Sequence, residues 1–347
     1  MVYQIGIVGA GALTRIALAP ALAAMPDARV AAVLDPDPLA LRSVADLCPD
    51  ALLTTDVERF FATGFDAVHI ATPNHLHEPY ALRTLRAGIP TIVDKPLGHT
   101  VESARAIAEA ADETGTTALV GYMAKHNAAN IEAARLVRTG AIGEPRAMVA
   151  ARLGWRKYDW RGRRSEGGLG CLADLGIYPV LTAVDLFGAD PVRCQATAYP
   201  IDDPERTELY AQATLWFDDQ RYLHLETSFT FDQQPASAEV SGYSLVGTEG
   251  ILQVNGGWAM NGGGTVDYCN GTGWHQSKLV TVDPYVSQYR TLMACAAGAP
   301  VPPELSLRRG VTDVEILYAI ADVAATATGP VPIQVGTAAA LAPVSGR

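Results

Sequence analysis

Short apolar segments alternate with helical segments over the first 122 residues of the chain. The apolar segments occupy residues 4–8, 30–34, 67–71, 91–93 and 118–121. Short apolar runs that are bounded by turn residues and separated by helices are typical of buried parallel strands. Helices are expected near residues 14–25, 79–87 and 101–114, with Thr100 as the N-cap of the last. The alternation predicts a doubly wound α/β domain, which binds ligands at the carboxyl ends of its strands.

A glycine motif, GIVGAG, spans residues 6–11 between the first strand and the first helix. In a dinucleotide site Gly9 permits the tight turn, and Gly11 lets the backbone approach a pyrophosphate at the helix N-terminus. We expect Ala12 and Leu13 to belong to the same site. Thr14 stands where the fingerprint has its third glycine, so the helix packs more loosely there or the change is absorbed locally. The alternative is an ordinary glycine turn in a domain that binds no nucleotide.

Asp35 ends the second strand, where an acidic side chain can accept hydrogen bonds from the ribose hydroxyls of a bound dinucleotide. A carboxylate at this place repels a 2′-phosphate, and no arginine follows before Arg42. NAD is therefore favoured over NADP. The alternative is a turn aspartate that precedes Pro36.

The stretch from Ala71 to Pro96 contains an apolar strand, a polar loop, a helix and a second strand that ends in Asp94-Lys95-Pro96. Parallel strands end at the same edge of their sheet, so both loops are expected at the ligand-binding edge. A lysine at this edge is a candidate functional residue; an exposed loop lysine is the alternative.

The pattern changes at about residue 125, which predicts two domains, 1–122 and 123–347. Strands with alternating apolar and polar residues indicate an antiparallel sheet with one buried face, at residues 192–199, 209–217, 222–231, 238–246 and 251–254. A further strand is expected from residue 145. Helices are expected at residues 127–138, within 167–188, and at 287–297 and 312–326, and the glycines of 256–264 read as a connection. The tail beyond Pro330 is expected to be partly loose.

The segment 155–166, WRKYDWRGRRSE, is aromatic and basic in an otherwise acidic chain. It suits a loop over a pocket, where rings stack on a substrate and arginines bind hydroxyls or a phosphate; a solvated loop anchored by tryptophans is the alternative. Asp174 and Tyr178 follow, four residues apart on one expected helix face. Pro179 indicates that the regular helix begins or bends near it.

Composition excludes several classes of partner. The net charge of −11 argues against a nucleic-acid or membrane partner. No apolar run reaches the roughly 18 residues of a membrane span, and the first strand begins too early for a signal peptide. Five widely spaced cysteines without a CxxC pair fit a reduced, cytoplasmic setting. His75 and His77 lack a third candidate ligand, so no metal is expected.

Six motifs in this order resemble the Gfo/Idh/MocA family of sugar and cyclitol oxidoreductases: GIVGAG (6–11), TPNHLH (72–77), DKP (94–96), VGYMAKHN (120–127), GGLGCLADLGIYP (167–179) and VGTEGILQV (246–254). The resemblance covers nearly the whole chain. It implies an N-terminal Rossmann domain and a C-terminal α+β domain with a large, mostly antiparallel sheet. The open face of that sheet would join the subunits of a homodimer or homotetramer.

The resemblance also implies roles for particular residues. Thr72, Pro73, Asn74 and His77 would line the cofactor site beside Asp94, which replaces the family's usual glutamate. Lys95 would be the active-site lysine, and Asp174 and Tyr178 match the family's D-x-G-x-H/Y positions. Tyrosine, in place of histidine, resembles the branch with glucose–fructose oxidoreductase, dihydrodiol and xylose dehydrogenases and nucleotide-sugar 3-ketoreductases. Lys125, where the family often has arginine, would bind substrate with Tyr158, Trp160, Arg161, Asp174 and Tyr178.

Hydride transfer at a carbinol carbon requires a group that accepts the hydroxyl proton. A free tyrosine has a pKa of about 10, and a neighbouring ammonium favours the phenolate. Tyr178 is therefore the expected acid/base, with Lys95 as its electrostatic partner and Asp174 orienting a substrate hydroxyl or the lysine. The leading hypothesis is an NAD(P)-dependent oxidoreductase of a sugar, sugar derivative or cyclitol. A keto-sugar reductase acting on a nucleotide-linked sugar and a non-catalytic nucleotide-binding sensor are the alternatives.

Overall fold

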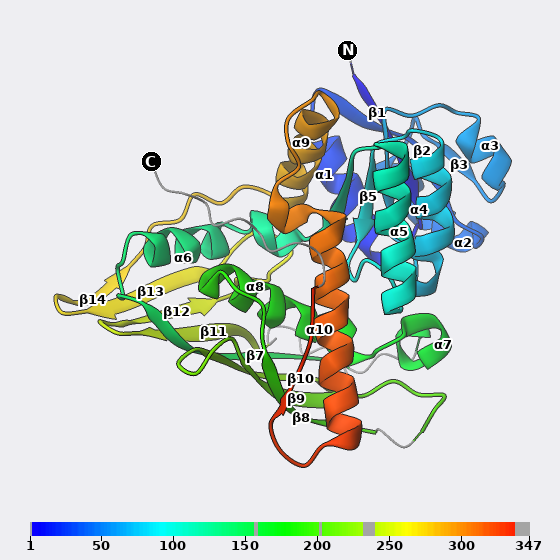
Figure 1. The fold of residues 1–347 in the computed structure, drawn as a ribbon. Coiled ribbons are helices and arrows are strands. Elements are labelled where there is room, and N and C mark those ends of the chain that lie inside the picture. The colour runs from blue at the N-terminus through cyan, green and yellow to red at the C-terminus, as the bar shows by residue number, and fades with distance from the viewer. Residues whose placement is uncertain (1, 156–158, 201–202, 232–239, 337–347) are drawn as a thin grey trace.

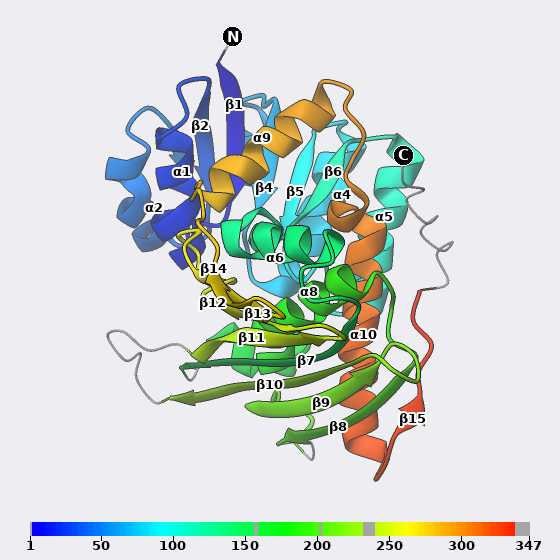
Figure 2. The same ribbon diagram turned by 90° about the vertical axis from the view of Figure 1, so that its left-hand side faces the viewer.

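The computed structural model describes residues 2–155, 159–200, 203–231 and 240–336. Two sheets organise these residues. One is a parallel sheet with helices on both sides, and the other is a larger sheet with helices on one side (Figures 1 and 2). The arrangement confirms the α/β fold with a mostly antiparallel second sheet.

The parallel sheet contains six strands in the order β3-β2-β1-β4-β5-β6. The strands are β1 (Tyr3–Val8), β2 (Ala28–Leu34), β3 (Leu52–Thr54), β4 (Ala67–Ile70), β5 (Thr91–Asp94) and β6 (Ala118–Gly121). All neighbours run parallel. Their interior is almost wholly apolar and buried, as the short apolar runs predict. The order is that of a Rossmann fold, whose ligand crevice lies where the order reverses, between β1 and β4.

Helices cover both faces of this sheet. A π-helical turn, Thr14–Leu18, continues into α1 (Ala19–Ala23), and α4 (His77–Arg86) and α5 (Val101–Thr114) follow as expected. Thr100 caps α5 by accepting a hydrogen bond from the Ser103 backbone N–H, within a full capping box. The short elements β3, α2 (Pro38–Val44) and α3 (Val57–Phe61) were not expected, because three to seven residues carry too little periodicity to be recognised.

The larger sheet contains nine strands in the order β14-β13-β12-β11-β7-β10-β9-β8-β15. They are β7 (Pro145–Trp155), β8 (Arg193–Tyr199), β9 (Tyr210–Trp216), β10 (Tyr222–Phe231), β11 (Val240–Gly247), β12 (Ile251–Asn255), β13 (Thr265–Asn270), β14 (Gly273–Gln276) and β15 (Val331–Pro332). Only the central pair β7 and β10 runs parallel among these described strands. The hairpin strands β13 and β14 were not expected. The tail from residue 337 lies outside the described residues.

One face of the larger sheet is covered by α6 (Ala128–Arg138), α8 (Ile177–Phe187) and α10 (Leu307–Thr326). A second π-helical turn, Leu172–Gly176, precedes α8, so the helix is irregular just before Pro179, as the proline predicts. Among the described elements none packs on the other face (Figure 2). By strand register and exposure, this face carries the side chains of Val149, Val246 and Trp274.

The last part of the chain returns to the first domain. From α9 (Pro284–Ala296), the Tyr289 hydroxyl lies 3.0 Å from Nδ1 of His69 in β4. From α10, Asp313 accepts a 2.6 Å hydrogen bond from the hydroxyl of Tyr122, just after β6. These buried contacts join α9 and α10 to the parallel sheet, and the division at residues 122 and 123 stays a prediction.

One helical stretch, residues 164–187, is long and apolar enough to cross a membrane by length and composition alone. However, 89% of its most apolar 18-residue window is buried inside the fold, where α8 packs on the larger sheet. It is therefore the core helix of the second domain, whose burial accounts for its apolar sequence.

Candidate active site

A cavity of about 420 Å³ opens at the carboxyl ends of β1, β2, β4 and β5. Its far wall comes from residues 159–174 of the second domain. Of the expected cofactor residues, the wall includes Gly9, Gly11, Ala12, Leu13, Asp35, Thr72, Pro73, Asn74, Asp94 and Lys95; of the expected substrate residues, it includes Trp160, Arg161 and Asp174. The cavity thus lies at the predicted edge, between the two domains.

The glycine loop has the shape that a pyrophosphate requires. Gly9 has φ +105°, and a Cβ there would stand 2.4 Å from the carbonyl oxygen of Ala71. Only glycine fits at this position, because β4 ends directly against the turn. A Cβ on Gly11 would meet no protein atom within 4 Å, although Gly11 belongs to the cavity wall. The space in front of Gly11 fits a dinucleotide phosphate at the helix N-terminus.

Thr14 compensates for the missing third glycine. Its side chain is fully buried, and its hydroxyl donates a 2.6 Å hydrogen bond to the carbonyl oxygen of Gly9. The departure from the fingerprint is therefore absorbed locally, because the threonine ties the first helical turn back to the glycine loop.

Asp35 joins the glycine loop to the turn that follows β2. Its carboxylate accepts hydrogen bonds from the backbone N–H groups of Ala10, at 2.7 Å, and Asp37, at 2.8 Å. The contact with Asp37 is the turn role of the alternative interpretation, and the contact with Ala10 reaches into the glycine loop. Each carboxylate oxygen can accept more than one hydrogen bond, so Asp35 retains the capacity to bind a ribose hydroxyl.

His77, the remaining residue expected at the cofactor site, lies behind the cavity wall and is 1% exposed. Its Nδ1 lies 2.9 Å from the carbonyl oxygen of Pro96, and its Nε2 lies 3.1 Å from that of Thr72. Burial lowers the pKa of His77 to about 4 despite these carbonyls, so the ring is neutral and donates to one of them. His77 therefore joins the TPNHLH loop to the DKP loop.

Lys95 points across the domain junction. Its ammonium donates a 2.7 Å hydrogen bond to the backbone carbonyl of Asp174 and lies 3.3 Å from that residue's carboxylate. Burial alone would lower the pKa of Lys95, but Tyr178, Asp174 and Asp94 outweigh it and raise the pKa above the ordinary value. The lysine is therefore a fixed cation at neutral pH.

Asp94 lies beside this lysine and packs closely against Gly121. Burial raises its pKa to about 6, although the adjacent Lys95 opposes the shift. A Cβ on Gly121, across the parallel pair β5 and β6, would stand 2.8 Å from Oδ1 of Asp94 and 3.0 Å from its Cα. Glycine at 121 is thus needed for the Asp94 side chain to occupy its place.

The second-domain wall is held by charge pairs. The Arg161 guanidinium lies 3.4 Å from the Asp174 carboxylate and donates a 2.8 Å hydrogen bond to Asp159. The same guanidinium stacks on the Trp160 ring, 4.2 Å from its centroid. Arg161 and Trp160 therefore reach the cavity as expected, whereas Tyr158 lies outside the described residues.

Tyr178 lies beside Lys95 and is not part of the cavity wall. Its ring is 7% exposed, and its centroid is 4.9 Å from the Lys95 ammonium. Asp174, in the π-helical turn, and Tyr178, in the first turn of α8, both reach this lysine. The predicted lysine, aspartate and tyrosine therefore converge at the domain junction.

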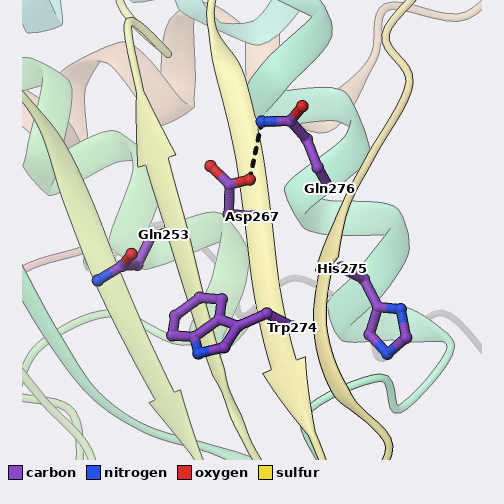
Figure 3. Close-up of a pocket in the computed structure, with 5 residues that line it drawn as sticks. All are labelled: Gln253, Asp267, Trp274, His275 and Gln276. Atoms are coloured by element: carbon purple, nitrogen blue, oxygen red, sulfur yellow. Dashed lines mark hydrogen bonds between the residues drawn. The ribbon is translucent and has the colours of Figure 1, made fainter.

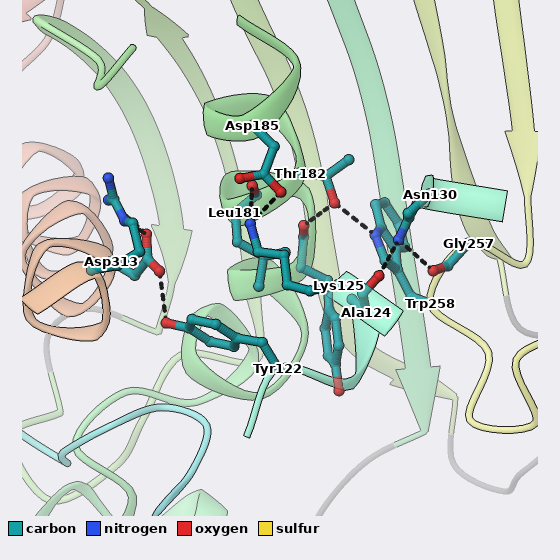
Figure 4. Close-up of polar contacts among 12 residues, drawn as sticks. Tyr122, Ala124, Lys125, Asn130, Leu181, Thr182, Asp185, Gly257, Trp258 and Asp313 are labelled. Atoms are coloured by element: carbon teal, nitrogen blue, oxygen red, sulfur yellow. Dashed lines mark hydrogen bonds and ion pairs between the residues drawn. The ribbon is translucent and has the colours of Figure 1, made fainter. Parts of the chain in front are cut away.

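Lys125, one of the expected substrate residues, lies away from the cavity wall. Its ammonium forms an ion pair with Asp185 and donates a 3.2 Å hydrogen bond to the carbonyl oxygen of Leu181, both in α8 (Figure 4). Its side chain is 6% exposed and does not line the cavity. Lys125 thus fastens the chain after β6 to the core helix, and its charge is neutralised there.

Several wall residues were missed from sequence. They include Leu76, Tyr80, Asp159, Leu169 and Gly170. Tyr80 lies one helical turn beyond His77, and Asp159 stands in the aromatic and basic segment, so proximity to the motifs was their only signal. Asn74 also has an unexpected contact, because its amide donates a 3.0 Å hydrogen bond to the carbonyl oxygen of Gly167 in the second domain.

The site combines a Rossmann sheet, a glycine loop where the strand order reverses, and a lysine that is hydrogen-bonded to the second domain. This combination is that of a nicotinamide-dependent oxidoreductase. The family model described as an oxidoreductase family with an NAD-binding Rossmann fold matches residues 3–122. The GFO/IDH/MocA C-terminal domain matches residues 131–253. The chain belongs to the Gfo/Idh/MocA family, which confirms the resemblance.

Named relatives act on different sugars. The dTDP-3,4-didehydro-2,6-dideoxy-alpha-D-glucose 3-reductase of Streptomyces violaceoruber is 28% identical over 253 residues, which are 73% of this chain and 72% of the relative. The 1,5-anhydro-D-fructose reductase of Ensifer adhaerens is 28% identical over 236 residues, 66% of this chain and 67% of the relative. The aldose-aldose oxidoreductase of Caulobacter crescentus, solved with glycerol, has a TM-score of 0.84 at 24% identity, covering 96% of this chain and 100% of that chain. Other structures of this fold hold NAD+ or NADP, so the fold alone does not select the cofactor.

Proposed function

We propose that this enzyme transfers hydride between a nicotinamide cofactor and a carbinol or carbonyl carbon of a sugar, sugar derivative or cyclitol. Tyr178 is the general acid/base, and Lys95 is its electrostatic partner. The observation that carries the proposal is the convergence of Lys95, Asp174 and Tyr178 from two domains beside the cavity that the glycine loop lines.

The nicotinamide, when bound, accepts or donates the hydride, and the protein handles the proton. In oxidation the Tyr178 phenolate takes the proton from the substrate hydroxyl, and in reduction the phenol returns it. The raised pKa of Lys95 keeps a positive charge near this oxygen, which favours the phenolate. Asp174 holds the ammonium in place through its carbonyl and carboxylate oxygens.

We propose NAD as the preferred cofactor. Asp35 lies on the cavity wall with its carboxylate oriented by the N–H groups of Ala10 and Asp37. A 2′-phosphate next to this carboxylate would meet a like charge at short range. The substitution Asp35→Ser should raise the affinity for NADP and so reduce the ratio of NAD affinity to NADP affinity.

The charges of the wall favour an uncharged sugar or polyol as substrate. Its described side chains include four carboxylates, Asp35, Asp94, Asp159 and Asp174, against the two cations Lys95 and Arg161. Arg161 is already paired with Asp159 and Asp174. A nucleotide-linked keto-sugar is the second candidate, and the observation in its favour is the similarity to a dTDP-sugar 3-reductase.

The test is nicotinamide absorbance with a panel of aldoses, inositols, glycosides and nucleotide sugars, with each cofactor. Tyr178→Phe and Lys95→Ala should lose turnover on any substrate found, while NAD still binds by calorimetric titration. Wild-type turnover in either variant would refute these roles. Activity confined to nucleotide sugars would instead support the second candidate.

We also propose that the enzyme acts in the cytoplasm. A further proposal is that the uncovered face of the larger sheet joins two or more copies of the chain. This face carries Val149, Val246 and Trp274, each more than 40% exposed. A shallow hollow at its β12–β14 end is lined by Gln253, Asp267, Trp274, His275 and Gln276 (Figure 3). Exposed apolar side chains on an uncovered sheet face are typical of an interface. Light scattering should report an oligomer that Val149→Glu dissociates and Val280→Glu, at an exposed loop site, leaves intact.

A further inference from the structure

Arg152 is a buried cation without a counter-ion. It lies in β7, between Thr227 of β10 and Ser241 of β11, and is 7% exposed. Its Nη1 donates a 3.2 Å hydrogen bond to the carbonyl oxygen of Trp258, whereas its buried Nε has no hydrogen-bond partner. Over the part of the chain that the structure describes, no carboxylate lies within ion-pair distance of this guanidinium.

A buried arginine normally has a carboxylate partner, because guanidinium cannot release its proton and its burial is costly. Arg309, which is equally buried, forms ion pairs with Asp313 and Asp190. Arg152 faces an aromatic ring instead, and its guanidinium carbon lies 3.9 Å from the ring centroid of Tyr178. The Lys95 ammonium lies 4.9 Å from the same centroid, so Tyr178 is next to two cations.

The surroundings fix this pair in place. Trp258 is fully buried, lies 5.9 Å from the Arg152 guanidinium, and donates from Nε1 a 3.0 Å hydrogen bond to the Thr182 hydroxyl (Figure 4). The Thr182 hydroxyl in turn donates to the carbonyl oxygen of Tyr178, at 2.8 Å. Trp258 therefore links the two residues: its carbonyl oxygen accepts a hydrogen bond from Arg152, and its indole N–H binds Thr182, which lies one turn after Tyr178 in α8.

The ionisable groups that face this pair come from several elements. They are Asp94 and Lys95 at the end of β5, Asp174 before α8, Tyr243 on β11 and Tyr285 on α9. Burial raises the pKa of Tyr285 well above its ordinary value, with the help of Tyr178 and Asp94, so Tyr285 stays a phenol. Asp94 and Asp174 are close enough to Lys95 to raise its pKa, and Asp174 forms ion pairs with Lys95 and Arg161. Among these described groups, the Tyr178 ring is the one that the Arg152 guanidinium contacts face-on, at 3.9 Å from its centroid.

We propose that Arg152 is a positioning residue whose guanidinium stacks on Tyr178 and serves as the counter-ion of the phenolate that accepts the substrate proton. The inference rests on the proposed role of Tyr178 and adds a second cation to the one that the family motif supplies. A buried cation without another partner stabilises the phenolate more strongly than the phenol, through charge as well as through contact with the ring face.

The test is a titration of the tyrosinate near-ultraviolet absorbance. The signal of Tyr178 is isolated as the difference between wild type and Tyr178→Phe, and the same difference is recorded in Arg152→Met and Arg152→Lys backgrounds. Arg152→Met should move the midpoint at least one pH unit higher, whereas Arg152→Lys should move it less. An unchanged midpoint in Arg152→Met would overturn the inference.

Kinetics separate this inference from the proposed function. For oxidation of the best sugar of the panel, kcat/KM should rise with pH. In Arg152→Met this rise should occur at higher pH, so kcat/KM should be about tenfold lower than in wild type at pH values within the rise and equal to wild type at high pH. An equal loss at every pH, or a reduced urea midpoint as the only change, would show a structural role instead. If Tyr178→Phe is active, the proposed function fails; if Tyr178→Phe is inactive and Arg152→Met leaves this rise at the same pH, only the role of Arg152 fails.

Discussion

Thr14 provides a test of how the glycine loop is stabilised, because a substitution toward the usual fingerprint should be harmful. Its hydroxyl donates a 2.6 Å hydrogen bond to the carbonyl oxygen of Gly9 in a fully buried setting. Thr14→Val keeps the volume of the side chain and removes only this bond. Loss of a buried hydrogen bond costs about 1–3 kcal/mol when its partner is left unsatisfied.

Thr14→Gly would restore the third glycine and should destabilise the protein more. It removes the same bond and the buried carbon atoms, at about 0.8 kcal/mol for each methylene equivalent. Glycine within a helix costs roughly a further 0.5–1 kcal/mol. With two carbon atoms lost, the sum is about 3–6 kcal/mol, while Thr14→Ser, which keeps the hydroxyl and loses one methyl group, should cost about 1 kcal/mol.

The assay is urea unfolding of the four proteins, followed by calorimetric titration of each with NAD. The expected order of stability is wild type, Thr14→Ser, Thr14→Val and Thr14→Gly. NAD should bind more weakly to the last two, since the hydroxyl anchors the loop that contacts the pyrophosphate. If Thr14→Val is as stable as wild type, or if Thr14→Gly is the more stable protein, the compensation that we describe is refuted.

Two further predictions concern the surroundings of Asp94 and the pH dependence of folding stability through His126, a half-buried residue at the end of the short helix after β6. Gly121→Ala should lower kcat/KM at least tenfold by displacing Asp94, which its Cβ would approach to 2.8 Å, whereas Gly271→Ala, with no atom within 4 Å, should leave kinetics unchanged. Burial lowers the pKa of His126 from 6.5 to about 4, so the folded protein binds fewer protons than the unfolded chain and its free energy of unfolding falls as pH drops through this range. His126→Gln should reduce that fall by up to about 1.4 kcal/mol per pH unit in urea titrations, and an unchanged slope would show that His126 is protonated or exposed.

Much of the fold was predictable because its signals are local. The strand segments β1, β2, β4, β5 and β6 are short apolar runs, and α5 carries its own cap at Thr100. The short strand and helices between β2 and β4, and the hairpin of β13 and β14, escaped prediction. Such short, half-exposed elements are stabilised by neighbours that are distant in sequence more than by their own periodicity.

The candidate site was predictable to a smaller extent. The motifs located the glycine loop, Asp35, Lys95, Asp174 and Tyr178, but they could not distinguish residues on the wall from residues behind it. His77 lies in a cofactor motif and yet joins two loops from behind. Lys125 follows another motif and is neutralised by Asp185 in the core helix. Both outcomes depend on which oxygen atoms the folded chain places nearby.

By itself, the sequence determined the class of the first domain, the edge of its sheet where ligands bind, and the family. These follow from local periodicity and from motifs of a few residues. Only the tertiary structure decided that Lys95 meets Asp174, 79 positions along the chain, and that Arg152 has an aromatic ring where a carboxylate is usual. The physical reason is that a buried charge takes its partner from whatever packing brings within a few ångströms, and packing joins residues from strands, helices and loops that no sequence spacing relates.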